Sequence, residues 1–229
     1  MSVETIGIDL FRKAMDFTLT SEQEMIRDVA REFTEKHIKP AARHLDEEGL
    51  FPYENLKKMA DLGFMGMNVP TEYGGSEVGV IAYSVVLTEI AKGCASHAVI
   101  TSVTNMVAEV IHEYGLEEVK RKHIPKLCNG AYPAGAFAIT EPHAGSDAAN
   151  LRTTAVRKGD TYILNGSKSL ITSGEVAGVT VTWAVTDHNA RKGKGLSAFV
   201  VEKGTPGFIP GKAEKKLGHR ASLTNELVF

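Results

Sequence analysis

Apolar residues recur at helical spacing over the first half of the chain, from Thr20 to about Asn129. Near the start of this stretch the spacing predicts an amphipathic helix, whose apolar face carries Ile26, Val29, Ala30 and Phe33. Ser21 followed by Glu24 predicts a capping box at the beginning of that helix. We therefore expect the chain to begin with a helical domain.

Proline and glycine divide this helical stretch into shorter elements. Pro40 should end or restart the first helix, because its ring removes a backbone donor and clashes with the preceding turn. A short helix is predicted for residues 53–62, and the Pro and paired Gly of residues 69–75 predict a loop. Residues 80–114 are apolar nearly all round and broken by Gly93, which predicts two helices buried in a bundle.

The pattern changes near Pro133, where short segments rich in Val, Ile, Thr, Phe and Tyr alternate with Gly, Asn and Asp. Such segments predict strands, at residues 134–139, 153–157, 161–165, 179–186, 196–202 and 226–229. Lys158, Gly159 and Asp160 suit a hairpin turn between two of them. The spacing favours an antiparallel β-sandwich or β-barrel, so the expected fold class is α+β.

These patterns predict three parts of the chain. Residues 1–14 precede a second possible start at Met15 and are interpreted as an extension. Residues 15–130 are predicted to form the helical domain and residues 131–229 a middle β domain. Because the last predicted strand ends on apolar residues, we expect the parent protein to continue into a further domain.

Composition excludes several classes of function. With 43% hydrophobic and 24% charged residues and a net charge of −2, the chain offers no electrostatic basis for binding nucleic acid or an anionic membrane. Cys94 and Cys128 lack the spacing of a zinc site or a disulfide scaffold, so no metal site is predicted. No apolar run is long enough to span a bilayer. We expect a soluble protein of the cytoplasm, or of an organelle matrix after processing.

Two segments carry candidate chemistry. Residues 137–147 run from an apolar strand into a loop with Pro, Gly, Ser and Asp, and residues 165–174 combine Gly with Ser, Thr and Lys. Loops of this kind can present backbone N–H groups and hydroxyls to an anion or to the edge of a heteroaromatic ring. Taken alone, each is interpreted more readily as a turn held by local side-chain to backbone hydrogen bonds.

Taken together and in this order, the two segments resemble those of the acyl-CoA dehydrogenase family. The resemblance extends from Met15 to Phe229, and its motifs are Met15-Asp16-Phe17 with Ser21-Glu22-Gln23, the loop from Val69-Pro70 to Gly75, Thr140-Glu141-Pro142 with Gly145-Ser146-Asp147, Leu164-Asn165-Gly166 with Lys168 and Ile171-Thr172, and Lys216-Leu217-Gly218 with Arg220. Dispersed matches in the correct order are more specific than any single glycine pattern. Ser102 and the surrounding residues look most like the short-chain, butyryl-CoA type branch.

The resemblance implies a flavoprotein oxidoreductase of fatty acid metabolism that uses FAD. In this family the α-proton of an acyl-CoA is removed and the β-hydrogen passes as hydride to the flavin N5, which gives a trans-2-enoyl-CoA. The cofactor carries the hydride, and the protein orients the reacting bond and tunes the charge on the ring. The implied substrate is an acyl-CoA of short chain length.

The resemblance also implies roles for individual residues. Eight are expected to bind FAD: Phe137, Ile139, Thr140, Gly145, Ser146, Leu170, Ile171 and Thr172. Phe137, Ile139 and Thr140 would line the pyrimidine side of the ring, and Thr172 would approach N5. Ser146 would bind the FAD pyrophosphate or the neighbouring pantetheine, so Ser146 and Ser102 are also candidate substrate-binding residues.

Two positions depart from the family pattern. Leu170 stands where the family usually has Trp or another aromatic residue, so it can cover the flavin ring by apolar contact but cannot stack on it. His143 stands where the family usually has Gly. A histidine there could sense pH beside the cofactor, although an exposed and solvated loop histidine is the favoured interpretation.

No catalytic residue is assigned. In the family the base is a carboxylate of a C-terminal helical domain, which we expect these 229 residues not to encode. Glu141 follows the flavin-contacting Thr140, and we do not assign it as the catalytic base. The protein is then expected to act in a homo- or hetero-oligomer with a chain that supplies this domain, and electron-transferring flavoprotein is a candidate acceptor. Two alternatives stay open, a non-catalytic acyl-CoA-binding or flavin-binding scaffold subunit and a fragment of a longer protein.

Overall fold

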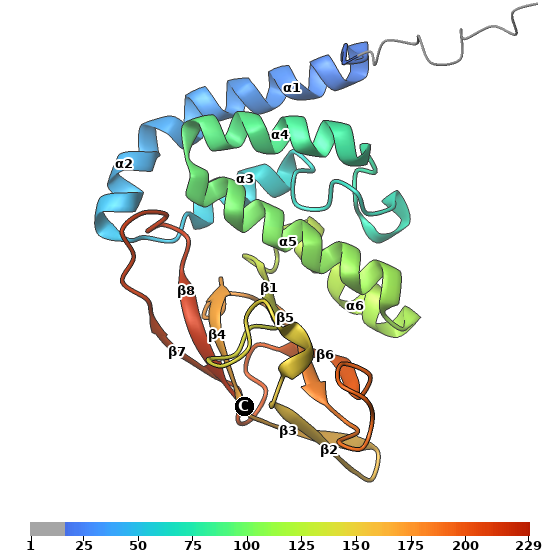
Figure 1. The fold of residues 1–229 in the computed structure, drawn as a ribbon. Helices are drawn as coiled ribbons and strands as arrows, with labels where there is room; N and C mark the ends of the chain where they lie inside the picture. The colour runs from blue at the N-terminus through green and yellow to red at the C-terminus, as the bar shows by residue number, and fades with distance from the viewer. Residues whose placement is uncertain (1–16) are drawn as a thin grey trace, which may run out of the picture.

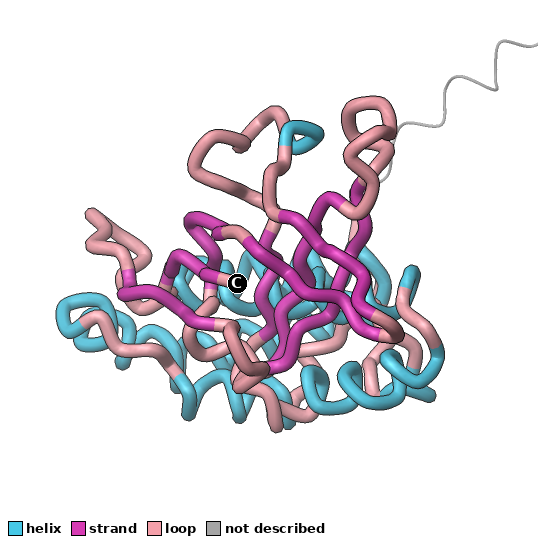
Figure 2. Tube along the Cα trace, turned by 90° about the horizontal axis from the view of Figure 1, so that it is seen from below, coloured by secondary structure: helices cyan, strands magenta, loops and turns pink. Residues whose placement is uncertain are grey.

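The computed structural model describes residues 17–229, with helices packed on one side of the molecule and β-sheets on the other (Figure 1). Seen from below, the strands lie in front of the helices (Figure 2). This agrees with the predicted α+β class, with the helical part first. The predicted extension 1–14 and the motif residues Met15 and Asp16 lie outside the described residues.

The helical part is divided into helices close to the positions predicted from proline and glycine. It comprises α1 (Ser21–Phe33), the π-helical turn η2 (Thr34–Ile38), α2 (Lys39–Glu48), α3 (Tyr53–Asp61), the 3₁₀ turn η3 (Thr71–Tyr73), α4 (Gly79–Gly93), α5 (Ala95–Tyr114) and α6 (Glu117–Cys128). Pro40 lies in the first turn of α2, directly after the π-helical turn η2, so the α-helix restarts there, as predicted, without a break in the helical chain. The break at Gly93 separates α4 from α5 as predicted.

The capping box at α1 lies one residue earlier than predicted. Thr20 is the N-cap, its side chain accepts from the Gln23 N–H, and the Gln23 side chain accepts from the Thr20 N–H. Ser21 and Glu24 are the first and fourth residues of the helix instead. The sequence Thr-Ser-Glu-Gln-Glu fits either register, because both pairs combine a hydroxyl with a carboxyl or amide three positions later.

The strands form two sheets that do not close into a barrel, so that part of the prediction is wrong. The strands are β1 (Gly135–Ala138), β2 (Thr154–Lys158), β3 (Thr161–Asn165), β4 (Ser167–Thr172), β5 (Val179–Val185), β6 (Leu196–Glu202), β7 (Ile209–Ala213) and β8 (Thr224–Val228), with the 3₁₀ turn η4 (Ala148–Asn150) between β1 and β2. One sheet has the order β1-β5-β2-β3 with β6 also on β5, and the other the order β4-β8-β7.

The expectation of purely antiparallel pairing is also wrong. β5 pairs with β6 and β2 with β3 in antiparallel fashion, but β1 and β2 both run parallel to β5. Alternation of apolar residues reports which face of a strand is buried and does not report the direction of its neighbour. The sequence prediction also missed β4 and β7 as strands.

Burial joins the two halves into one packed molecule. α5 packs on β1, and this contact is close at Gly135, where a Cβ atom would lie 2.8 Å from Cγ1 of Val107. One apolar cluster lies among the helices, a second joins α5 and α6 to β5, and a third lies between the two sheets. β1 therefore takes part in packing on both of its sides, and the segment that follows it begins from a fixed position.

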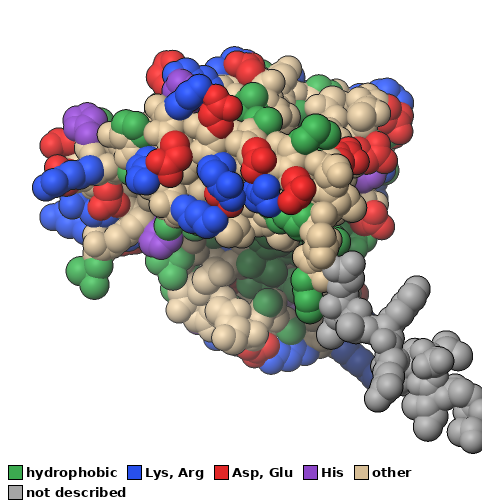
Figure 3. All heavy atoms as spheres, turned by 90° about the horizontal axis from the view of Figure 1, so that it is seen from above, with side chains coloured by type: hydrophobic (Ala, Val, Ile, Leu, Met, Phe, Trp, Pro, Cys, Tyr) green, Lys and Arg blue, Asp and Glu red, His purple; other side chains and the backbone are tan. Residues whose placement is uncertain are grey.

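The outer face that carries α1 shows basic and acidic side chains interspersed rather than gathered by sign (Figure 3). Exposed ion pairs occur along the helices, such as Lys39 with Glu35 and Arg43 with Glu47. Exposed pairs of this kind contribute little stability. None of the helices described in residues 17–229 is both long and apolar enough to cross a membrane.

Candidate functional site

The two segments singled out in the sequence meet in the structure. The backbone N–H of Ser169 on β4 donates to the carbonyl oxygen of Thr140, which follows β1, at 2.8 Å. Beyond Thr140 the chain turns back on itself, because Glu141 and Ala144 exchange two backbone hydrogen bonds of 3.0 Å. The loop after β1 is thus fastened to the strand that carries Leu170 and Thr172.

A buried ion pair lies beneath this junction. The Lys168 ammonium, with a side chain that is 0% exposed, donates to Glu141 Oε1 at 2.7 Å and to the carbonyl oxygen of Ile139 at 3.3 Å. The two Glu141 oxygens also accept from the backbone N–H groups of Arg152 at 2.7 Å and Thr153 at 3.0 Å. One carboxylate therefore connects β4, the loop after β1 and the start of β2.

Electrostatics keeps both partners charged. Burial alone would raise the pKa of the Glu141 carboxyl, but the hydrogen bonds from Lys168, Thr153 and Arg152 outweigh it and lower the pKa to about 2. Burial lowers the pKa of the Lys168 ammonium, and the adjacent carboxylate opposes this. Because all the hydrogen bonds of Glu141 are made inside the protein, this carboxylate is a structural group and is not free to accept a substrate proton.

His143 is an exposed loop residue, as was favoured from the sequence, but it also has a carboxylate neighbour. Its Nε2 lies 3.3 Å from Glu141 Oε2, and its side chain is 31% exposed. The turn between Glu141 and Ala144 brings the imidazole back over the carboxylate. This contact could not be predicted from the sequence, because the His143 side chain reaches Glu141, two residues earlier, only when the chain turns between Glu141 and Ala144.

β4 presents Leu170 and Thr172 away from the core. Its pairing with β8 shifts between Lys168 and Ile171, and at this bulge Leu170 takes φ of 60° and remains 65% exposed. Left-handed backbone is costly for a leucine, and such strain concentrates at functional sites. Ile171 points the other way, is 2% exposed and packs between the sheets, so only its backbone could face a ligand.

Several polar groups at this site have no protein partner. The hydroxyls of Thr140, Thr172 and Ser146 and the backbone N–H groups of Gly145 and Ser146 form no hydrogen bond within residues 17–229. Thr140 and Thr172 are half-buried, whereas Gly145 and Ser146 are exposed. A set of free donors beside an exposed apolar side chain suits a ligand with a flat ring and polar edges.

The remaining predicted residues lie farther into the protein. Phe137 is half-buried on β1 and its ring centroid lies 4.4 Å from that of Trp183 on β5. Ile139 contributes its carbonyl to Lys168. Ser102 lies on α5, where its hydroxyl accepts from Tyr83 of α4 at 3.3 Å, so it belongs to the helical part and is already partnered.

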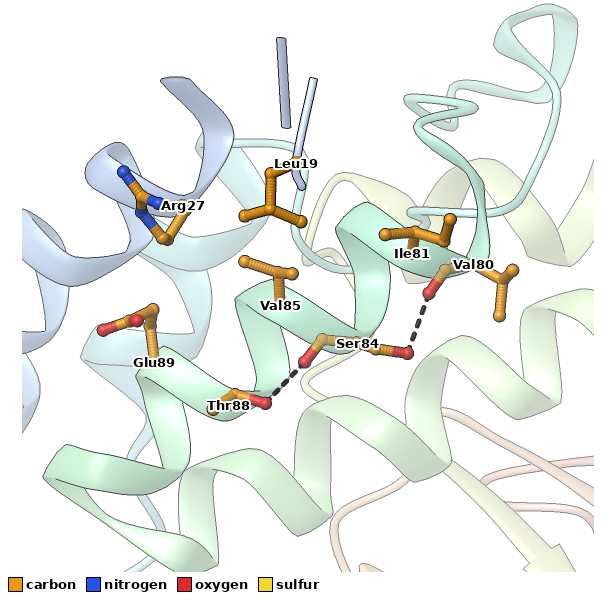
Figure 4. Close-up of a pocket in the computed structure, with 8 residues that line it drawn as sticks. All are labelled: Leu19, Arg27, Val80, Ile81, Ser84, Val85, Thr88 and Glu89. Carbon is orange, nitrogen blue, oxygen red and sulfur yellow. Dashed lines mark hydrogen bonds between the residues drawn. The ribbon is translucent and has the colours of Figure 1, made fainter. Parts of the chain in front are cut away.

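A cavity of about 420 Å³ lies away from these two segments, between α1 and α4 (Figure 4). Leu19, Val80, Ile81 and Val85 supply its apolar wall. Its charged groups are engaged with other residues, since Arg27 pairs with Asp28 and Glu24, and Glu89 pairs with Arg31 and Lys92. The cavity has no free charged group that could orient a reacting molecule, so we do not take it as the site.

Two buried residues of reactive type are structural. Burial raises the pKa of the Cys128 thiol to about 11, so it is protonated at neutral pH and is a poor nucleophile. His97 on α5 is fully buried, and its Nε2 lies 3.1 Å from the Asn55 amide nitrogen. Burial lowers the pKa of His97 to about 4, which keeps the imidazole neutral at physiological pH.

His97 should make the protein less stable in mild acid. Its pKa in the folded state, about 4, lies below the ordinary value of 6.5, so between these values the unfolded chain binds more protons. The free energy of unfolding should therefore fall by roughly 2 kcal/mol as pH drops from 7 to 4.5. Urea unfolding across this range should show a flatter profile for His97→Gln, which stays neutral; equal slopes in both proteins would contradict the assignment.

Lys168 belongs to one of the sequence motifs, but no role was predicted for it. A signal was present, because Lys168 and Ile171 occupy the buried positions of a segment whose other residues are polar or exposed. A lysine at a buried strand position requires a counter-charge, and Glu141 was the carboxylate in the companion segment. The bulge that exposes Leu170 carries no comparable sequence signal.

Two protein-family models match the chain. Residues 20–131 match the model of the acyl-CoA dehydrogenase N-terminal domain, and residues 136–229 match that of the acyl-CoA dehydrogenase middle domain. Together these matches cover nearly all of the described residues.

Two curated relatives are similar over nearly all of this chain. The short-chain specific acyl-CoA dehydrogenase of Clostridium acetobutylicum is 48% identical over 217 residues, which are 94% of this chain and 56% of that protein. The acryloyl-CoA reductase (NADH) of Anaerotignum propionicum is 46% identical over 220 residues, 95% of this chain and 55% of that protein. The chain thus spans little more than half the length of the relatives it matches.

Solved structures agree with this similarity. Butyryl-CoA dehydrogenase from Megasphaera elsdenii superposes with a TM-score of 0.86 at 39% identity, over 94% of this chain and 57% of that one. A glutaryl-CoA dehydrogenase from Mycobacterium smegmatis in complex with FADH2 gives 0.86 at 34% identity, over 92% and 53%. The arrangement of helices and sheets described above is therefore shared with these dehydrogenases.

Proposed function

Because this chain belongs to the acyl-CoA dehydrogenase family, we propose that it forms the flavin-binding side of an FAD-dependent enzyme that introduces a double bond into a short acyl-CoA. Residues 15–130 would be the helical domain and residues 131–229 the middle domain of that enzyme. The short-chain preference rests on the relatives with that specificity.

The observation that carries the proposal is the junction between the loop after β1 and strand β4. The hydrogen bond from Ser169 to Thr140, with the Lys168 and Glu141 pair beneath it, fixes the loop after β1 against β4. Thr140, Thr172 and the exposed Leu170 then belong to one rigid unit. Pre-organised donors of this kind bind a cofactor without first having to be ordered.

The residues present fit a flavin. Two unpartnered threonine hydroxyls can bond the polar edge of the ring, Leu170 can cover its face, and the free N–H groups of Gly145 and Ser146 suit a pyrophosphate oxygen. FAD, when bound, would supply the hydride acceptor. The protein side contributes orientation and donors that stabilise negative charge on the bound ring.

The catalytic base is proposed to come from residues outside this sequence or from a partner subunit. Glu141 is the carboxylate closest in sequence to Thr140, but it is 3% exposed and saturated with hydrogen bonds. Its pKa of about 2 also makes it a weak base. We therefore propose that activity requires an assembled enzyme, with electron-transferring flavoprotein as a candidate acceptor.

The proposal is tested by the flavin content of the purified full-length protein. We expect one FAD per chain, identified by mass after acid release, and reduction of its visible absorption on addition of butyryl-CoA. Thr172→Val removes a free hydroxyl with little change of volume, so the content of FAD should persist while reduction slows roughly tenfold. The matched control is Thr180→Val on β5, which removes a buried hydroxyl outside the two loops.

Three outcomes would separate the alternatives. A colourless protein that takes up no flavin would contradict the proposal. Bound flavin that no acyl-CoA reduces in the full-length protein would instead favour a non-catalytic binding subunit. Equal slowing by Thr172→Val and Thr180→Val would show that the Thr172 hydroxyl has no specific part in the reaction.

A further inference from the structure

We propose that Lys216 is a positioning residue of the candidate flavin site, which acts through Thr224 to place a positive charge and an oriented hydroxyl beside Thr172. The inference rests on the proposed function and deepens it, because it assigns a group that favours the reduced form of the bound ring. Lys216 begins one of the motifs found in the sequence, and the sequence indicated no task for it.

The Lys216 ammonium is half-buried in the loop between β7 and β8, where it donates to neutral oxygens. Its acceptors are the carbonyl oxygens of His219, at 2.8 Å, and of Ser222, and Oγ1 of Thr224 at 3.1 Å. Three such bonds use all three N–H donors of an ammonium group. In the part of the chain that the structure describes, Lys216 forms no ion pair.

The charge of Lys216 is therefore not neutralised by a hydrogen-bonded carboxylate. Lys168, by contrast, donates directly to Glu141. Burial lowers the pKa of Lys216, and the Asp46 carboxylate opposes this from a distance. Asp46 is itself engaged, because its Oδ1 accepts from the Arg220 N–H at 2.8 Å. A partly buried cation without a direct counter-charge stabilises negative charge that forms nearby.

Thr224 connects this charge to β4. Thr172 and Thr224 are directly opposite each other in the antiparallel pair of β4 and β8, so their side chains lie on the same face, with Cβ atoms about 4.5–5.5 Å apart. This face is the outer one, because the adjacent Ile171 and Asn225 are buried. The Thr224 hydroxyl accepts from Lys216 and finds no acceptor among the described residues, so its proton is free to donate on the outer face.

The loop that carries Lys216 is fastened to the helical part. It passes beside α2 (Figure 1), where the Arg220 N–H donates to Asp46 and the Arg220 guanidinium donates to the Glu47 carbonyl oxygen at 3.0 Å. Both acceptors lie near the C-terminal end of α2. The ammonium is thus held in place before a ligand binds, and its electrostatic effect requires no reorganisation.

The expected effect follows from the charge balance of hydride transfer. A hydride brings two electrons and one proton to the ring, which therefore gains one negative charge. With Thr172 at the N5 edge, the charge of Lys216 lies behind that edge and favours the ring after this gain over the ring before it. Loss of the charge should weaken the binding of reduced FAD and leave the binding of oxidised FAD unchanged.

The test measures the reduction potential of the bound flavin in the full-length protein, without acyl-CoA, by equilibration with a reference dye. Lys216→Met should lower the potential by about 30 mV, which is a tenfold change in the equilibrium constant of a two-electron couple. Lys216→Arg keeps the charge and should retain the wild-type potential. The matched control is Lys215→Met, which removes the same charge from an exposed neighbour in the same loop and should leave the potential unchanged.

Thr224→Val tests the connection separately. It removes the hydroxyl while Lys216 keeps its bonds to the carbonyl oxygens of His219 and Ser222. The potential should fall by less than in Lys216→Met, because the charge stays in place. Anaerobic titration of the FAD-free proteins should show that Lys216→Met weakens the binding of reduced FAD roughly tenfold and does not change that of oxidised FAD.

The assignment is overturned if Lys216→Met has the wild-type potential, or if Lys215→Met lowers the potential equally. Equal weakening of oxidised and reduced FAD would also overturn it, because Lys216 would then only hold the loop in place. If Lys216→Met does not fold, a wild-type potential in Thr224→Val overturns the assignment in its place. If the wild-type protein takes up no flavin, the proposed function fails and the assignment fails with it, whereas flavin uptake with an unchanged potential rejects the assignment alone.

Discussion

Lys168→Met is expected to lower the free energy of unfolding by about 3–5 kcal/mol and to abolish retention of flavin. Methionine fills most of the space but leaves the buried Glu141 carboxylate without its counter-charge. It also removes the bond from Lys168 to the Ile139 carbonyl, which holds the loop after β1. Thermal unfolding of the full-length protein, with and without added FAD, measures both effects.

The double variant Lys168→Met/Glu141→Gln provides the control. Replacing both charges removes the stranded carboxylate, and Gln can still accept a backbone N–H, so the double variant should be more stable than Lys168→Met alone. Flavin retention should remain impaired, because the connection between β4 and Ile139 is still missing. If Lys168→Met were as stable as the wild-type protein, the pair would not hold the loop after β1 against β4.

The order of helices and strands could be predicted from the sequence, because buried apolar residues recur at a spacing that differs between helices and strands. Helical spacing before residue 130 and short alternating runs after it predicted the α+β class and six of the strands. β4 was hidden because its bulge breaks the alternation between Lys168 and Ile171. β7 was hidden because Pro210 and Gly211 are poor strand formers, and they are tolerated here beside an irregular pairing with β8.

From the sequence, the candidate site could be predicted only as two separate segments. The motifs placed free hydroxyls and N–H groups in the loop after β1 and on β4, but local sequence does not show that Ser169 bonds to Thr140. That contact, like the parallel pairing of β1 with β5, joins residues far apart in the chain and depends on the whole sheet. The ion pair between Lys168 and Glu141 could not be predicted for the same reason. Burying either charge alone would be unfavourable, and only the fold brings the two together.

The strain at Leu170 is interpretable once the fold is known. Within a regular strand the residue after Lys168 and Ser169 would return its side chain to the core. The bulge instead lets Leu170 and Thr172 share the outer side while Ile171 remains buried. An exposed leucine with φ of 60° is unfavourable for solvation and for the backbone, so a leucine at this position is explained best by contact with a ligand.

Leu170→Asn should therefore separate stability from flavin binding. Asn tolerates left-handed backbone and exposure better than Leu, so the protein without FAD should be as stable as the wild type or more stable, by up to about 1 kcal/mol. Loss of an apolar contact of about 1.5–3 kcal/mol should weaken FAD binding by roughly 10- to 100-fold. Leu170→Trp, which can stack on the ring, should instead strengthen binding.

Titration of the FAD-free protein with FAD, followed by quenching of flavin fluorescence, measures these affinities, and thermal unfolding measures the stabilities. Ile163 on β3, which is 46% exposed, supplies a control as Ile163→Asn, since it removes an exposed apolar side chain outside the two loops. If Leu170→Asn and Ile163→Asn left FAD affinity equally unchanged, Leu170 would not cover the flavin. The outward bulge of β4 would then need another explanation.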